Sequence, residues 1–194
     1  MARTRLDRST VVEAARNLLD EEGLSGFSMT RLGDRLGVTA MALYRHVKDR
    51  AELENAVVEL VLDDLMLEDE SEDAVANWMR RVRAHWLEHP WLGMLLGNSS
   101  TLNQPWIEVL LHLAGALTRA GLDDDAAARE VIRISRITSG IVIQEIRAPL
   151  PTRKGIGDSM PQFKPTLSTY DNEALFDDLV AETMARIEHQ VRTS

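Results

Sequence analysis

Apolar side chains recur at helical spacing along almost the whole chain, and this pattern limits the fold more than any other feature. Val11, Ala14, Ala15, Leu18 and Leu19 form the first such stripe, and a period of 3.6 residues is typical of an amphipathic helix. No run alternates apolar and polar residues over the length of a strand, and no segment repeats another. The sequence therefore predicts an all-α fold.

Capping residues, glycines and prolines divide this pattern into successive helices. Thr10-x-x-Glu13 is a capping-box pattern that would begin the first helix, and Gly23 would end it. Further helices are expected at residues 28–36, 40–47, 49–67, 74–89, 91–97, 105–120, 124–148 and 173–192. Residues 149–172 hold four of the six prolines, which indicates a long surface loop of the kind that often covers a binding site.

Composition excludes several classes of protein. With 194 residues and 44% hydrophobic residues, the chain can bury a core as one large or two small domains. The absence of cysteine excludes a disulfide scaffold, a thiolate zinc site and a cysteine nucleophile. No apolar run is long enough to span a bilayer, and the first 20 residues lack the apolar stretch of a signal peptide. We therefore expect a cytoplasmic protein with no membrane partner.

Charge is distributed unevenly along the chain. Residues 1–50 hold nine basic and seven acidic residues, a net charge of +2, whereas the remainder carries 13 basic and 24 acidic residues, a net charge of −11. A polyanion would be attracted to the first segment and repelled by the second.

Residues 27–48, FSMTRLGDRLGVTAMALYRHVK, predict two short helices joined by a tight turn. The first would end at Leu36, Gly37 would supply a positive φ in the turn, and Thr39 would cap the second helix. This pattern is typical of a helix-turn-helix, although an ordinary helical hairpin of a bundle would share it. Residues expected to pack against Val12, Ala15 and Leu19 of the first helix are Leu32, Leu36, Val38, Leu43 and Val47. Residues expected on the exposed side are Thr39, Ala40, Met41, Ala42, Tyr44, Arg45 and His46.

Residues 23–53 resemble the DNA-binding domain of the tetracycline-repressor (TetR) family. The resemblance is carried by Leu36-Gly37-Val38 and by Leu43-Tyr44-x-His46-Val47-Lys48. It implies a homodimeric, ligand-responsive transcriptional regulator, usually a repressor, that is not an enzyme and needs no cofactor. Residues 1–48 would form the DNA-binding domain, and residues 49–194 would form a helical domain for ligand binding and dimerisation, with a connecting helix at 49–67.

The resemblance also implies which residues contact double-stranded DNA. These are Ser28, Thr30 and Arg31 of the second helix, Thr39, Met41, Tyr44, Arg45 and His46 of the third, and Lys48 before the fourth. Arg45 is the best candidate to contact a base directly, while Tyr44, His46 and Lys48 would position phosphates. The alternatives are that Tyr44 is a core aromatic and that Arg45 is a solvated surface charge. Ala40 and Ala42 stand where tetracycline-type repressors place polar base-contacting residues, so the operator sequence does not transfer.

Dimerisation follows from the same resemblance. One recognition helix makes few base contacts, so a palindromic operator with half-sites about 34–36 Å apart is expected. The helices at 124–148 and 173–192 would form the dimer interface, although each could instead lie in the core. Arg3 and Arg5 could form a minor-groove arm or a disordered tail.

An effector site is expected among the middle helices, because all four tryptophans lie within residues 78–106. A small, largely apolar effector would contact Trp86, Trp91, Met94, Asn98, Trp106, His112, Thr138 and Phe163. For any single tryptophan, ordinary core packing is the alternative. Leu95 stands where tetracycline repressors carry a metal-coordinating histidine, so a tetracycline–magnesium ligand is not expected.

A competing hypothesis comes from His85-Trp86-Leu87-Glu88-His89, which has the H-x-x-E-H spacing of a zinc peptidase family. On this hypothesis the chain is a helical metal-dependent hydrolase that uses His85, Glu88 and His89. Pro90 would end the helix immediately afterwards, and no third ligand is recognisable, so we expect no metal site. A helical interaction protein with a vestigial hairpin is a third hypothesis.

Overall fold

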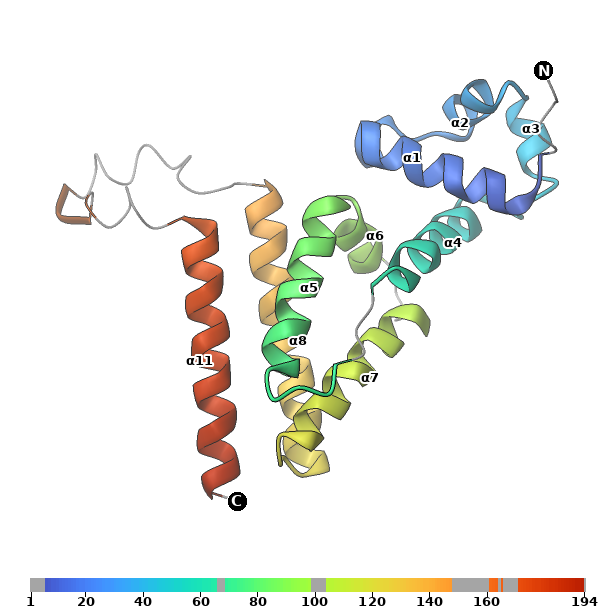
Figure 1. The fold of residues 1–194 in the computed structure, drawn as a ribbon. Coiled ribbons are helices and arrows are strands. Elements are labelled where there is room, and N and C mark those ends of the chain that lie inside the picture. The colour runs from blue at the N-terminus through green and yellow to red at the C-terminus, as the bar shows by residue number, and fades with distance from the viewer. Residues whose placement is uncertain are drawn as a thin grey trace. The chain divides into compact units, whose positions relative to one another are not determined.

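The computed structural model describes residues 6–65, 69–98, 104–147, 161–163, 165 and 171–193 (Figure 1). These residues form helices and no strand, which confirms the all-α prediction. The elements are α1 (Arg8–Gly26), α2 (Met29–Leu36), α3 (Ala40–Leu43), α4 (Arg50–Asp63), α5 (Ala74–Glu88), α6 (Leu92–Asn98), α7 (Gln104–Arg119), α8 (Asp124–Arg147), the 3₁₀ helix η1 (Pro161–Phe163) and α11 (Asn172–Thr193). None of the helices in the described ranges combines the length and apolar character needed to cross a membrane. Most of the loop expected at 149–172 lies outside the described residues.

The chain divides into two compact units. The first comprises residues 1–66 and 88–109, and the second comprises residues 67–87 and 110–194. The first unit therefore holds α1 to α4, α6 and the start of α7, and the second holds most of α5, the rest of α7, α8 and α11.

The core of the first unit lies where α1 packs on α2 and α4. The predicted apolar stripe of α1 is buried except for Ala14, which is half-buried, and α4 contributes a matching stripe. Buried side chains of this core are Val11, Val12, Ala15, Leu18, Leu19, Leu32, Leu43, Val47, Leu53, Val57 and Val61. Leu36 and Val38 were expected in the same core but are only half-buried.

Helix α1 begins earlier than the capping-box pattern predicts. Asp7 is the N-cap, and its carboxylate accepts hydrogen bonds from the Thr10 backbone N–H (2.9 Å), the Thr10 hydroxyl (2.8 Å) and the Ser9 hydroxyl (2.9 Å). These bonds lower the pKa of Asp7 to about 2. The prediction that Thr10 caps this helix is therefore wrong, because the Asp7 carboxylate already accepts a hydrogen bond from the Thr10 N–H. Gly23 breaks the helical conformation as expected, with φ of 66°, but a further turn follows to Gly26.

In the second unit, a buried carboxylate joins α8 to α11. Glu130 is 2% exposed and accepts hydrogen bonds from Arg133, from Arg186 Nε (2.9 Å) and from Gln190 Nε2 (3.2 Å). Burial alone would raise the pKa of Glu130, but the hydrogen bonds from the two guanidinium groups outweigh burial and lower it. Because the partners lie on both helices, this network fixes their alignment.

A second charged contact joins α5, α8 and α11. The Arg83 guanidinium donates two hydrogen bonds to Glu145, from Nε (2.9 Å) and from Nη2 (2.7 Å). Its carbon atom lies 5.0 Å from the centre of the Phe176 ring, so the cation also rests on an aromatic face. This two-bonded geometry is the most specific one available to an arginine and a carboxylate.

Replacing Glu130 with Gln should destabilise the second unit. Glu130→Gln leaves two guanidinium groups beside a neutral amide, and we expect the free energy of unfolding at pH 7 to fall by about 2 kcal/mol. The folded-state pKa is lowered, so the stabilisation is complete above the usual carboxyl range and is lost as pH falls through the folded-state value. Urea denaturation measures the free energy of unfolding of the unsubstituted protein and of Glu130→Gln. The difference between these two free energies should therefore be large at pH 7 and smaller at pH 4. The exposed Glu182→Gln on α11 is the control, and equal stability of all three proteins at pH 7 would contradict the role of Glu130.

Candidate DNA-binding surface

The turn between α2 and α3 depends on two glycines. Gly37 ends α2 in the left-handed conformation, with φ of 68° and ψ of 31°. The N–H groups of Gly37 and Val38 then donate to the carbonyls of Asp34 (3.2 Å) and Gly33 (2.9 Å). A Cβ on Gly33 would lie 2.8 Å from the Val38 carbonyl oxygen and 3.1 Å from the Ala40 nitrogen. Only a glycine therefore allows the start of α3 to pack this closely on α2.

Both short helices begin at the expected N-caps. The Ser28 hydroxyl accepts from the Arg31 N–H (3.2 Å), and the Thr39 hydroxyl accepts from the Ala42 N–H (3.3 Å). Asp49 caps α4 by accepting from the Glu52 N–H (2.8 Å), as the Asp49-x-x-Glu52 pattern predicts. The three caps fix where the turns between α2, α3 and α4 fall.

Helix α3 is shorter than the expected range of 40–47. It ends at Leu43, and the Arg45 and His46 N–H groups donate to the carbonyls three residues earlier, Ala42 (3.3 Å) and Leu43 (2.8 Å). Such bonds tighten the last turn of a helix. Tyr44, Arg45 and His46 consequently lie in this tightened turn and not in an α-helix.

The candidate surface, defined as Thr39, Met41, Tyr44, Arg45, His46 and Lys48, lies along α3 and the turn after it. Met41 is 74% exposed and Tyr44 is 42% exposed, so neither is a core side chain. Thr39, Arg45 and Lys48 are exposed, while His46 is half-buried. The interpretation of Tyr44 as a core aromatic is therefore wrong.

Three candidates precede this surface on or next to α2. Thr30 and Arg31 are exposed, and Ser28 is half-buried because it caps the helix. Arg31 forms an ion pair with Glu22 (2.8 Å). Arg3 and Arg5 lie outside the described residues.

Ion pairs occupy most of the other basic side chains in this unit. Arg8 pairs with Glu52, Arg31 with Glu22, Arg35 with Glu21, and Arg50 with Glu54. Within residues 6–65, the charged groups of Arg16, Arg45 and Lys48 have no carboxylate partner, and of these three side chains only Arg45 and Lys48 are exposed. The sequence alone could not reveal this difference, because Arg8 and Glu52 are 44 residues apart.

Comparison with known proteins shows that this surface lies within a segment that matches a family model. Residues 11–57 match the model of the family described as bacterial regulatory proteins, tetR family. Over these residues the chain is similar to the DNA-binding part of the tetR family. Among the curated members of this family, the HTH-type transcriptional repressor DrrR1 of Streptomyces coeruleorubidus is 30% identical over 154 residues, covering 75% of this chain and 53% of DrrR1. The chain thus spans about half the length of that relative.

Solved structures of tetR-family proteins share the whole fold. The Streptomyces coelicolor protein ActR, in complex with (S)-DNPA, has a TM-score of 0.76 at 21% identity and covers 97% of this chain and 100% of its own. BioQ with its double-stranded DNA operator has a TM-score of 0.67 at 25% identity and covers 92% of this chain and 99% of its own. An N-terminal helix-turn-helix followed by further helices is therefore the architecture of this chain.

The residues expected to bind an effector fall in both compact units. In the first unit, Trp91 and Trp106 are buried and Met94 is 41% exposed. In the second unit, Trp86 and Thr138 are buried and His112 is exposed. The side chains of Asn98 and Phe163 lie outside the described residues. A single effector site formed by all eight residues stays a prediction.

One histidine of the motif at the end of α5, His89, makes a structural contact within the first unit. Asp20 Oδ1 lies 2.8 Å from His89 Nδ1 and accepts a hydrogen bond from Trp91 Nε1 (2.7 Å). His89 thereby helps to fix the segment after α5 to α1 within the first unit. The relatives are regulators, and nothing in the comparisons supports the hydrolase hypothesis.

Sequence reasoning missed Gly33, which should matter as much as Gly37. We expect Gly33→Ala to lower the free energy of unfolding by about 1–3 kcal/mol, because its Cβ would press against backbone atoms that cannot move independently. Gly97→Ala on α6 is the matched control, since its Cβ would meet nothing within 4 Å. Chemical denaturation followed by circular dichroism measures both, and a Gly33→Ala protein as stable as the Gly97→Ala protein would contradict the close approach.

Proposed function

We propose that the chain is a ligand-responsive, homodimeric transcriptional repressor of the cytoplasm. It binds a palindromic operator through the candidate surface and is released by a small, largely apolar effector. Residues 1–48 act as the DNA-binding domain, and residues 49–194 act as the ligand-binding and dimerisation domain, with α4 as the connecting helix. The similarity to known regulators supports this proposal, since DrrR1 is a repressor and BioQ has a DNA operator.

The observation that carries the proposal is the pair of cations without carboxylate partners, Arg45 and Lys48, on the exposed turn after α3. A guanidinium held by a carboxylate must break that contact before it binds DNA, whereas these two groups bind without such a cost. Lys48 suits a phosphate, because its ammonium is a compact point charge. Arg45 suits guanine, whose O6 and N7 accept two hydrogen bonds from one guanidinium in the major groove.

The remaining candidates position the chain on the duplex. Tyr44 and His46 flank Arg45 and would contact phosphates, as would Ser28, Thr30 and Arg31 from α2. Thr39 lies at the N-terminus of α3, while Met41 offers an apolar contact to thymine methyl groups. On this proposal α3 and the turn after it supply base and phosphate contacts, and α2 supplies further contacts to phosphates of the DNA.

Dimerisation through α8 and α11 explains an exposed apolar side chain on α8. Ile132 is 58% exposed, and Ser139 and Ile143 follow it on the same face of the helix at positions that are half-buried. Gly140 lies beside them, and a Cβ there would meet open space. A second copy of the chain would cover this face, while the Glu130 network keeps α8 and α11 aligned.

The effector site is supported by a buried hydroxyl in the second unit. Thr138 is fully buried, and its hydroxyl has no hydrogen-bond partner within the described ranges. An unsatisfied buried hydroxyl costs about 1–3 kcal/mol, which a polar group of a bound effector would offset. Trp86, buried in the same unit, would supply apolar contact area.

Release by the effector requires only a modest coupling between the two sites. A free energy of about 1–3 kcal/mol changes operator affinity by roughly 5–150-fold. We infer no enzymatic role for the chain, in agreement with its similarity to transcriptional regulators.

Substitution of the two cations tests this function. Against a duplex selected from a random pool, Lys48→Ala should weaken binding to all sequences and reduce the slope of log affinity against log salt by about 1. Arg45→Ala should cost about 1–3 kcal/mol and relax the sequence preference at one base pair of each half-site. Fluorescence anisotropy over a salt series measures both effects.

The matched control is Arg35→Ala, which removes an exposed arginine whose guanidinium is held by Glu21. It should change operator affinity by less than either of the other substitutions. If the three variants bind alike, Arg45 and Lys48 do not form the DNA contacts and the proposed function loses its basis.

A further inference from the structure

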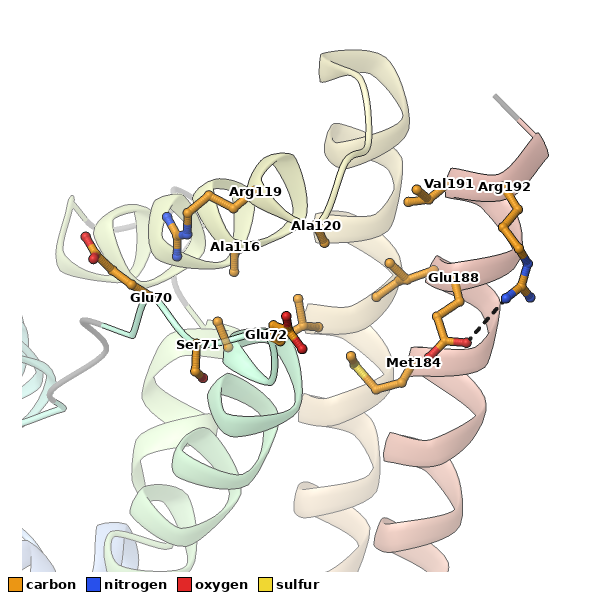
Figure 2. A pocket seen from close by; sticks show the side chains of 13 residues that line it. Glu70, Ser71, Glu72, Ala116, Arg119, Ala120, Met184, Glu188, Val191 and Arg192 are labelled. Atoms are coloured by element: carbon orange, nitrogen blue, oxygen red, sulfur yellow. Dashed lines mark ion pairs between the residues drawn. The ribbon is translucent and has the colours of Figure 1, made fainter.

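The second unit contains a cavity that the proposed repressor function does not use. It has a volume of about 530 Å³, within the roughly 300–1,000 Å³ typical of sites for small molecules. The segment before α5, the C-terminal part of α7 and the C-terminal part of α11 surround it (Figure 2). None of the residues expected to bind the effector lines it.

Small side chains on facing helices leave this space open. Ala74, Ala116 and Ala120 line the cavity from α5, α7 and the residue after α7. Val75 and Ile187 complete a buried apolar floor, and Met184 and Val191 of α11 add further apolar surface. Such a floor favours an apolar group of the ligand, because removing apolar surface from water is favourable in proportion to its area.

The rim of the cavity carries more carboxylates than guanidinium groups. Glu188 and Arg192 lie together on α11, while Glu70, Glu72 and Arg119 lie on the segment before α5 and on α7 (Figure 2). Arg192 pairs with Glu188 (3.7 Å), and Arg119 donates to the Asp69 carbonyl oxygen (2.8 Å). Within the described residues, Glu70 and Glu72 have no ion-pair partner, so they remain available to a cation.

Hydrogen bonds hold the segment that presents these two carboxylates. Hydrogen bonds from the Ser71 hydroxyl, from the Ser71 N–H (2.9 Å) and from Asn77 Nδ2 (2.7 Å) to the Asp69 carboxylate lower the pKa of Asp69 to about 2. The bond from Arg119 to the Asp69 carbonyl attaches the same segment to α7. Glu70 and Glu72 therefore stand on a fixed backbone beside an apolar floor.

We propose that this cavity binds a small organic cation with an apolar chain. The chain lies on the floor formed by Val75, Ala116 and Ile187, and the cationic head lies between Glu70 and Glu72. This inference goes beyond the proposed repressor function, because it concerns a second ligand site whose occupation is measured without DNA.

Three probes that share an octyl chain, and that differ in the charge of the head group, test the recognition of charge. We expect octyltrimethylammonium to bind the full chain at one site in isothermal titration calorimetry, at least fivefold tighter than 1-octanol or octyl sulfate. The double variant Glu70→Gln/Glu72→Gln should lose this preference for the cation. The exposed Glu182→Gln on α11, which does not line the cavity, should keep it.

A second pair of variants tests the place of binding. Ala120→Phe adds a ring to an exposed residue of the cavity lining and should abolish binding of the cation, whereas Ala84→Phe at an exposed position on α5 should not. Equal binding of the cation and octyl sulfate by the unsubstituted chain, or unchanged cation binding by Ala120→Phe, would overturn the proposal. Retention of the cation preference by the double glutamine variant would overturn it as well.

Discussion

The position of α3 depends on a close backbone contact at Gly33, where α2 meets the turn formed by Gly37. The Val38 N–H donates to the Gly33 carbonyl, and the missing side chain at Gly33 lets the start of α3 lie against α2. This contact places Leu43 and Val47 in the core, and Met41, Tyr44 and Arg45 before and between them are exposed. The exposed side chains on which the proposed DNA contacts depend are therefore a consequence of backbone geometry.

Charge pairing then selects among the exposed basic residues. The acidic residues of α1 and α4 hold Arg8, Arg31, Arg35 and Arg50, and they do so at a surface where such pairs contribute little stability. These ion pairs matter more for the proposed function than for stability. Each pair neutralises a positive charge on the first unit that would otherwise attract DNA. The positive charge that remains unpaired among residues 6–65 includes the end of α3, where a duplex would lie.

Much of the fold could be predicted from the sequence, because the signals are local. Helical period, the caps Ser28, Thr39 and Asp49 and the glycine at 37 all depend on residues within one or two turns, and the structure confirms them. The capping role of Thr10 was wrong because Asp7 competes for the same N–H groups. The length of α3 was also wrong, because three further residues tighten into a turn before α4 begins.

The site was less predictable for a physical reason. Exposure of Tyr44 and Arg45 follows from helical spacing, but the pairing of the other arginines requires contacts between residues far apart in the sequence. Gly33 carried a usable signal, since a glycine inside an eight-residue helix weakens that helix unless another backbone approaches it. The clustering of tryptophans gave no such guidance, because Trp86 and Trp91 are close in sequence yet belong to different compact units.

The most direct test of the account is selection of duplexes by the full chain from a pool of random sequence. If α3 of each protomer enters a major groove, the enriched sequences will contain two inverted half-sites whose centres are about 10–10.5 base pairs, or a multiple of that spacing, apart. Enrichment of sequences without dyad symmetry, or no enrichment at all at moderate salt, would contradict the central claim that this exposed turn recognises an operator.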